Sequence, residues 1–171
     1  MAKAELTRGA TLAGFVESLQ VPDEPEKQTI ADIQVVVFDL DGSEYAIPIH
    51  AVREILRVPR IGRVPHAPEN VRGVINVRGQ ILPVIELRTR LGLEPLDPGS
   101  QARVLVVESG DRVAGLLVDR VRHVLRIPED TLVQGDKLPA TTGRSVAALA
   151  QLGDRLIIML DLDQTLWSEA S

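Results

Sequence analysis

Two short segments of the chain carry closely spaced aspartates that could perform chemistry. Each pair follows a hydrophobic run, in VVVFDLDGS at residues 35–43 and in IIMLDLDQT at residues 157–165, and one residue separates its two members. Neighbouring carboxylates can supply a nucleophile, exchange a proton or bind Mg²⁺. An enzymatic site is therefore the first hypothesis that the sequence raises.

Both segments resemble the opening motif of the haloacid dehalogenase phosphatases. The resemblance implies a nucleophilic first aspartate, a general-acid second aspartate and Mg²⁺ between them. Two features argue against it: six residues follow Thr165, too few for the remaining catalytic elements, and that fold alternates strands with helices, whereas this chain predicts strand after strand. The Mg-dependent phosphatase is kept only as the alternative from another functional class, and no catalytic residue is assigned.

Other residues suited to chemistry give weaker signals. The chain has no cysteine, which excludes disulfides and thiolate ligands. Its histidines, His50, His66 and His123, lack the spacing of metal ligands. We therefore expect no metal site and no cofactor.

An internal repeat organises the chain. Residues Val35 to Pro59 align with Val104 to Pro128 without a gap, at an offset of 69 positions. Seven of the 25 aligned pairs are identical: Val35/Val104, Val37/Val106, Val52/Val121, Arg53/Arg122, Leu56/Leu125, Arg57/Arg126 and Pro59/Pro128. Residues present in both copies are expected to maintain the shared fold, and residues present in only one copy become candidates for function.

The first copy reads mainly as strands and turns. Residues 34–40 and 45–49 predict a hairpin around Asp41-Gly42-Ser43, and residues 73–77 and 80–85 predict a second hairpin around Arg78-Gly79. Residues 50–57 predict a short helix with Val52, Ile55 and Leu56 on one face, and residues 87–91 predict a helical turn.

The second copy follows the same plan. Its corresponding segments are residues 104–107, 113–118 and 121–125, and a final hairpin runs from Ser145 through Gly153-Asp154 to Leu162. There IIMLDL matches LPVIEL of the first copy at an offset of 75. The aspartates at 39 and 41 align with Glu108 and Gly110, which makes them turn residues. Short strands joined by tight turns describe two small antiparallel barrels, with the boundary near residues 92–101.

The first 31 residues differ from the rest. Leu12, Phe15, Val16 and Leu19 fall at helical spacing, and a polar, proline-broken stretch follows at residues 21–27. We expect an N-terminal extension over residues 1–31, formed by an amphipathic helix and a linker, before a domain over residues 32–171.

The unpaired residues of each copy are the candidates for function. Asn76 and Gly79 suit a tight turn, but turn geometry does not require the guanidinium of Arg78. In the second copy, Asp119 follows an apolar strand and precedes the predicted helix, where an N-cap is expected.

Composition excludes several classes of protein. The net charge of −5 and the four aromatic residues argue against nucleic-acid binding. The longest apolar stretches, such as residues 156–160, are too short to insert into a bilayer. A cytoplasmic, soluble protein is expected.

Four segments, in this order and spacing, resemble the CheW family of chemotaxis coupling proteins: FDLDGSEYAIPIHAVREIL, VPHAPENVRGVINVRGQILPVIELR, VAGLLVDRVRHVL and LGDRLIIMLDLDQTL. The match covers about residues 34–166. It implies a mainly β fold of two intertwined, five-stranded SH3-like barrels on a shared hydrophobic core, with short helices and no catalysis. One departure is Glu86, which stands where the family usually has aspartate.

The resemblance also implies partners and sites. Family members bridge the regulatory domain of a CheA-type histidine kinase and the cytoplasmic tip of methyl-accepting chemoreceptors, in membrane-associated receptor arrays. The receptor tip lies in the groove between the barrels, where Val52 and Val121 would come from equivalent helices. Receptor-binding positions would be Val52, Glu54, Gly73, Asn76, Arg78, Gly79, Gly115 and Val121. The alternative within the family is an adaptor of another chemosensory pathway, in pilus motility or polar localisation.

Overall fold

The computed structural model describes residues 31–134, 137–139 and 142–167. The predicted N-terminal helix therefore lies outside the described residues. In chain order the elements are β2 (Asp32–Leu40), β3 (Ser43–Pro48), η1 (Ile49–Ala51), β4 (Val52–Arg57), β5 (Val71–Val77), β6 (Gln80–Glu86), α3 (Leu87–Arg90), β7 (Arg103–Ser109), β8 (Arg112–Val118), β9 (Arg120–Pro128), η2 (Glu129–Thr131), β10 (Leu132–Gln134), β11 (Val146–Leu152), β12 (Arg155–Leu160) and α4 (Leu162–Trp167). The prediction of a mainly β fold with short helices is confirmed.

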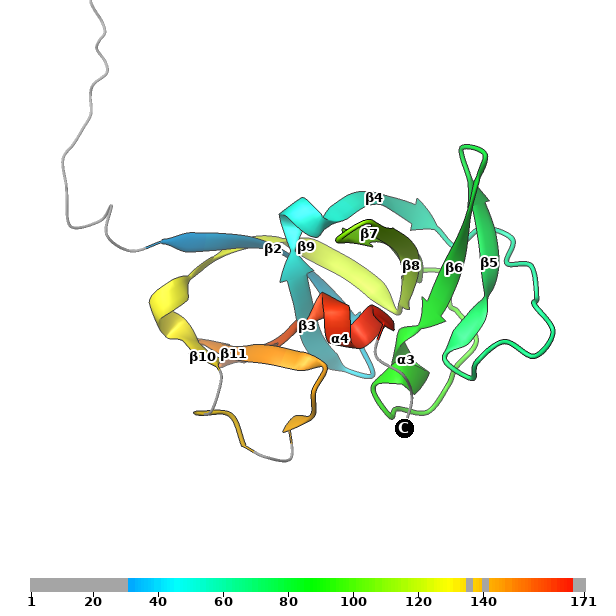
Figure 1. The fold of residues 1–171 in the computed structure, drawn as a ribbon. Coiled ribbons are helices and arrows are strands. Elements are labelled where there is room, and N and C mark those ends of the chain that lie inside the picture. The colour runs from blue at the N-terminus through cyan, green and yellow to red at the C-terminus, as the bar shows by residue number, and fades with distance from the viewer. Residues whose placement is uncertain (1–30, 135–136, 140–141, 168–171) are drawn as a thin grey trace, which may run out of the picture. The chain divides into compact units, whose positions relative to one another are not determined.

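The strands form two sheets (Figure 1). One has six strands in the order β10-β11-β12-β3-β2-β9, and we call it sheet A. The other has five strands in the order β4-β7-β8-β6-β5, and we call it sheet B. The three-residue strand β10 makes sheet A one strand larger than the five expected.

The two copies of the repeat exchange their first hairpins. Strands β2 to β6 and helix α3 correspond to β7, β8, β9, β11, β12 and α4, so sheet A combines the β2–β3 hairpin with second-copy strands and sheet B does the converse. The two parallel strand pairs are also equivalent: Met159 lies opposite Ala46 in sheet A, as Val84 lies opposite Gly115 in sheet B. Residues 92–101 join the copies along the chain, while each sheet draws strands from both.

Three clusters of buried side chains form the core. The largest, which we call the seam cluster, includes Phe38 and Tyr45 from sheet A together with Leu105 and Leu116 from sheet B. The other two clusters lie on the opposite faces of the sheets, one with Val35 and Val37 and similar residues of sheet A, and one with Val104 and Val106 and similar residues of sheet B. Strands β2 and β7 are thus buried on both faces, which explains their continuous apolar runs.

The helix predicted over residues 50–57 is wrong. Only Ile49–Ala51 forms a short 3-10 turn, and Val52–Arg57 is strand β4, antiparallel to β7. Burial alternates along β4 with a period of two, because even-numbered residues are half-buried and odd-numbered residues are exposed. The apolar residues of this segment fit a helical period as well as a strand period, and pairing with β7 decides between them. The same correction applies to the second copy, where residues 121–125 lie in β9.

Candidate functional site

The predicted hairpin residues meet at the tip of β5 and β6. Arg78 donates hydrogen bonds from Nε and Nη2 to the carboxylate of Glu54 on β4, at 3.1 and 3.3 Å. The Asn76 side-chain oxygen accepts a hydrogen bond from the Gly79 N–H at 2.9 Å and closes the turn. Four of the eight predicted receptor-binding residues therefore form one contiguous group.

The backbone of Arg78 adds a physical reason to regard it as functional. Its φ is +52°, and that of Gly79 is +85°. Positive φ at both central residues defines the type I′ hairpin turn, which favours Asn-Gly or Asp-Gly. A bulky side chain in this region costs about 1–2 kcal/mol. Arginine is therefore a poor choice for the turn, and its side chain is 81% exposed, which leaves most of the guanidinium accessible to a partner.

Val52 and Val121 occupy equivalent positions on equivalent strands, β4 and β9, and not on helices as expected. Both are half-buried and pack against the seam cluster. Glu54 lies opposite Val106, whose side chain belongs to the interior cluster of sheet B. Val52 lies opposite Val107 of the seam cluster, and a β-bulge between Val52 and Glu54 interrupts the regular alternation of β4. Residues paired across neighbouring strands share a face of the sheet, so Val52 and Glu54 lie on opposite faces of β4.

The structure places Gly73 and Gly115 in the interior. A Cβ on Gly115 would lie 2.7 Å from a methyl carbon of Val104, and one on Gly73 would lie 2.2 Å from the Gly62 carbonyl oxygen. Both glycines permit close packing beneath the surface.

Ile55 and Val124 are exposed residues beside the seam that the sequence reasoning missed. They are the same repeat position, and they are 44% and 49% exposed. Ile55 lies opposite Leu105 of the seam cluster, which places it on the same face of β4 as Val52. The repeat implies the equivalent face for Val124, so this pair would extend the apolar surface of the seam, and burial of that surface against a partner would be favourable. The repeat alignment already contained the signal, because it pairs an isoleucine with a valine.

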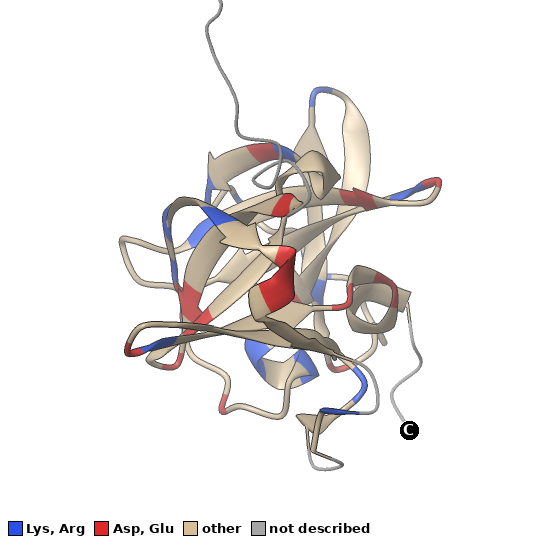
Figure 2. Ribbon diagram, turned by 90° about the vertical axis from the view of Figure 1, so that its left-hand side faces the viewer, with Lys and Arg blue, Asp and Glu red and all other residues tan. Residues whose placement is uncertain are grey.

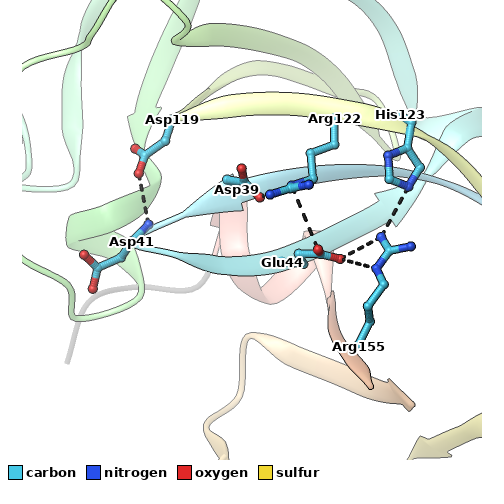
Figure 3. A network of polar contacts seen from close by, with 7 residues as sticks. All are labelled: Asp39, Asp41, Glu44, Asp119, Arg122, His123 and Arg155. Carbon is cyan, nitrogen blue, oxygen red and sulfur yellow. Dashed lines mark hydrogen bonds and ion pairs between the residues drawn. The ribbon is translucent and has the colours of Figure 1, made fainter. Parts of the chain in front are cut away.

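Asp119 is not a helix N-cap as expected, since β9 and not a helix follows it. Its carboxylate accepts hydrogen bonds from Arg88 at 3.0 and 2.7 Å. It also accepts one from the Asp41 N–H at 2.9 Å (Figure 3). Burial raises the pKa of Asp119, but these hydrogen bonds and the charge of Arg88 outweigh it and hold the pKa below its usual value.

The aspartates of the two motifs have structural partners. Asp39 lies 2.6 Å from Arg122, and Glu44 accepts hydrogen bonds from Arg155, whose guanidinium also lies 3.3 Å from His123 (Figure 3). Strands β2 and β3, which flank the first motif, are antiparallel, unlike the parallel strands of the phosphatase fold. The Asp161 carboxylate accepts a hydrogen bond from the Gln164 N–H at 3.0 Å, in the first turn of α4. Within the described ranges, no three histidine, aspartate or glutamate side chains gather into a metal site.

Comparison with known proteins identifies the family. The model of the CheW-like domain matches residues 34–170. The chain belongs to the CheW-like family. It is 32% identical over 139 residues to a probable chemotaxis protein CheW of Rhizobium etli, which covers 81% of this chain and 89% of that protein.

Two further similarities bear on fold and pathway. The crystal structure of the scaffolding protein TtCheW from Thermoanaerobacter tengcongensis has a TM-score of 0.74 and 29% identity, over 82% of this chain and 98% of that one. Protein PilI of Pseudomonas aeruginosa is 36% identical over 114 residues, or 67% of this chain and 63% of PilI. This CheW-like chain therefore has the fold of a CheW scaffolding protein. Among the residues that the structure describes, no helix has the length and apolar character needed to span a bilayer.

Proposed function

We propose that this CheW-like protein is a non-catalytic adaptor that couples chemoreceptors to a CheA-type histidine kinase. The observation that carries the proposal is the Glu54–Arg78 pair, which holds an exposed arginine on a hairpin tip whose turn does not favour arginine. The protein would work in the cytoplasm, at membrane-associated receptor arrays.

The seam suits a helical partner. Val52 and Ile55 from sheet B and Val121 and Val124 from sheet A offer apolar side chains beside the shared core. An amphipathic helix buries an apolar stripe in such a surface. The Glu54–Arg78 pair lies on the other face of β4, which is at the edge of sheet B, so Arg78 would reach a partner that extends past this edge. It would supply specificity there, because a guanidinium can bind a carboxylate or the carbonyl groups at a helix end. We assign the receptor tip to this surface.

The mixed surface charge also supports a protein partner. Acidic and basic residues are interspersed over the described part of the chain (Figure 2). Nucleic-acid-binding proteins usually gather lysine and arginine on one face. An interface with another protein needs no such separation of charge.

The decisive test is capture of partners by the full-length protein. A CheA-type kinase and a receptor-tip fragment from the same cell should each co-purify with the wild type, and Val52→Glu should abolish capture of the receptor fragment. A substitution on the exposed linker, Leu96→Glu, changes charge equally and should leave capture intact. Failure of the wild type to bind either partner would end the coupling proposal.

The likeness to PilI favours a second candidate, a CheW-like adaptor of another chemosensory pathway, in pilus motility or polar localisation. Residues 1–30 would then supply an additional contact. Deletion of these residues should impair localisation if this candidate is right and should leave it unchanged if the receptor-coupling role is sufficient.

A catalytic role has a direct test. Hydrolysis of a generic phosphate ester that requires Mg²⁺ and is lost in Asp39→Asn would contradict the adaptor proposal. We expect no such activity, because Asp39 is held in an ion pair with Arg122.

A further inference from the structure

The chain passes between the two sheets at two equivalent crossings. The first is η1, which joins β3 of sheet A to β4 of sheet B. The second is Asp119, which joins β8 of sheet B to β9 of sheet A. His50 and Asp119 are the same position of the repeat, 69 residues apart. The first crossing leads directly to Val52 and the second, one residue later, to Val121.

The second crossing is held by a buried arginine. The Arg88 side chain on α3 is only 9% exposed, and its guanidinium binds both carboxylate oxygens of Asp119. Arg88 also donates to the Glu94 carbonyl at 2.9 Å and lies 3.6 Å from the Asp41 carboxylate. The Asp119 backbone N–H donates to the Asp39 carbonyl at 3.1 Å. Side-chain and backbone contacts thus tie this crossing to α3 and to the β2–β3 hairpin.

The first crossing lacks this arrangement. At an offset of 75, Arg88 corresponds to Asp163 on α4, so the charge is reversed. At an offset of 69, Asp41 corresponds to Gly110 and Asp119 to the exposed His50. No ion pair ties His50 to another side chain of the described residues, and a cleft of about 490 Å³ opens beside it, lined by residues that include Ser109 and Asp161.

We propose that Arg88 and Asp119 are positioning residues that fix one wall of the partner groove, while the other wall adjusts when a partner binds. The bidentate Arg88–Asp119 contact holds the start of β9 and therefore Val121. Among the described residues the crossing at η1 has no such contact, so β4 and Val52, which pair with β7, can shift more readily than the start of β9. The groove would open on the Val52 side only. The difference in contacts between the two crossings, which we call the unequal hold, is a property of this chain alone. Its consequence for partner binding rests on the proposed function.

Amide hydrogen exchange of the full-length protein tests the unequal hold without any partner. In the wild type, segment 117–122 should exchange about tenfold or more slowly than segment 48–53, because local opening of the tied crossing must break several hydrogen bonds. Arg88→Met should remove this difference, with faster exchange of the Asp119 amide. Equal exchange of the two segments in the wild type would overturn the proposal.

Two variants separate positioning from general destabilisation. Exchange of the Leu105 amide in the core reports global unfolding, so a rise there equal to that at Asp119 would show only loss of stability and count against the proposal. The charge-swapped chain, Arg88→Asp with Asp119→Arg, should restore slow exchange at the crossing. Failure of the swap to restore it, in a chain whose core stays protected, would also contradict the proposal.

The repeat allows the missing contact to be built. His50→Asp with Asp163→Arg places the two partners of the contact at the first crossing, and segment 48–53 should then exchange about tenfold more slowly. If the Val52 wall must adjust, this variant should also bind the receptor-tip fragment more weakly than the wild type. Slower exchange of segment 48–53 with unchanged affinity for the receptor-tip fragment would contradict the proposal that the Val52 side of the groove adjusts on binding. Absence of binding by the wild type would instead reject the proposed function and leave the exchange result standing.

Discussion

Replacement of Arg78 by asparagine should separate stability from partner binding. Arg78 occupies a left-handed backbone position with φ of +52°, where a bulky side chain costs about 1–2 kcal/mol and asparagine costs less. The change also removes the ion pair with Glu54, but the arginine is 81% exposed, so screening by solvent limits that pair to at most about 1 kcal/mol. The two effects oppose each other. Arg78→Asn should be as stable as the wild type or up to about 1 kcal/mol more stable.

Binding should change in the opposite direction. A charge-assisted hydrogen bond to a partner carboxylate contributes about 1.5–3 kcal/mol, so affinity for a receptor-tip fragment should fall about tenfold or more. Urea denaturation measures the free energy of unfolding, and calorimetric titration measures the affinity. Arg60→Asn, a change at an exposed arginine in the loop between β4 and β5, is the control for lost charge. Loss of more than about 2 kcal/mol of stability in Arg78→Asn would show that the arginine supports the fold, and our reading of the turn would be refuted.

Three further predictions concern packing, charge and the groove. Gly115→Ala should destabilise the protein by about 1–3 kcal/mol in thermal or urea unfolding, because its methyl group would lie 2.7 Å from Val104, and adding Val104→Ala should recover part of that loss. Asp119 has a lowered pKa in the folded state, so its contribution to stability is complete above its unfolded pKa of about 3.9 and is lost as the pH falls through the folded value. Urea denaturation of wild type and Asp119→Asn should therefore give a stability difference that is constant near neutral pH and shrinks only below about pH 4; a difference that persists at lower pH would contradict this assignment. Val124→Glu should leave the unfolding free energy within about 0.5 kcal/mol and prevent receptor-tip binding, unlike Leu96→Glu, and equal binding by both variants would exclude Val124 from the interface.

The repeat made most of the fold predictable. Both first-copy hairpins were found because their turns carry Asp41-Gly42 and Arg78-Gly79, and the structure gives all four residues positive φ. The error at residues 50–57 arose because VREILR fits both periods, and local sequence does not reveal that β7 lies alongside. The exchange of hairpins between sheets is also absent from local sequence, since it depends on which strands pair over long distances.

The site was predictable to a different degree. Glu54 and Arg78 were both named from the family resemblance, but their direct contact across 24 residues is known only from the structure. Gly73 and Gly115 were also named as contact residues; both are buried where an added Cβ would meet neighbouring atoms within 3 Å, so packing is a role the structure supports, and partner contact stays a prediction. The sequence does not distinguish a glycine at an interface from a glycine buried beneath it. In both places glycine is needed because other atoms approach too closely to leave room for a Cβ.

The use of the repeat to separate scaffold from function needs one refinement. Five of the seven identical pairs are buried or half-buried, as a scaffold residue should be, whereas Arg53/Arg122 and Arg57/Arg126 are exposed in both copies. The first of these pairs has an equivalent cross-strand partner in each copy: Arg122 lies 2.6 Å from Asp39, and Arg53 lies 3.6 Å from Glu108, the same repeat position. Identity between copies thus includes shared surface ion pairs. A reversal of charge between copies, as at the buried Arg88 and the exposed Asp163, is the more selective signal, because a charge is buried only where a partner such as Asp119 offsets its desolvation.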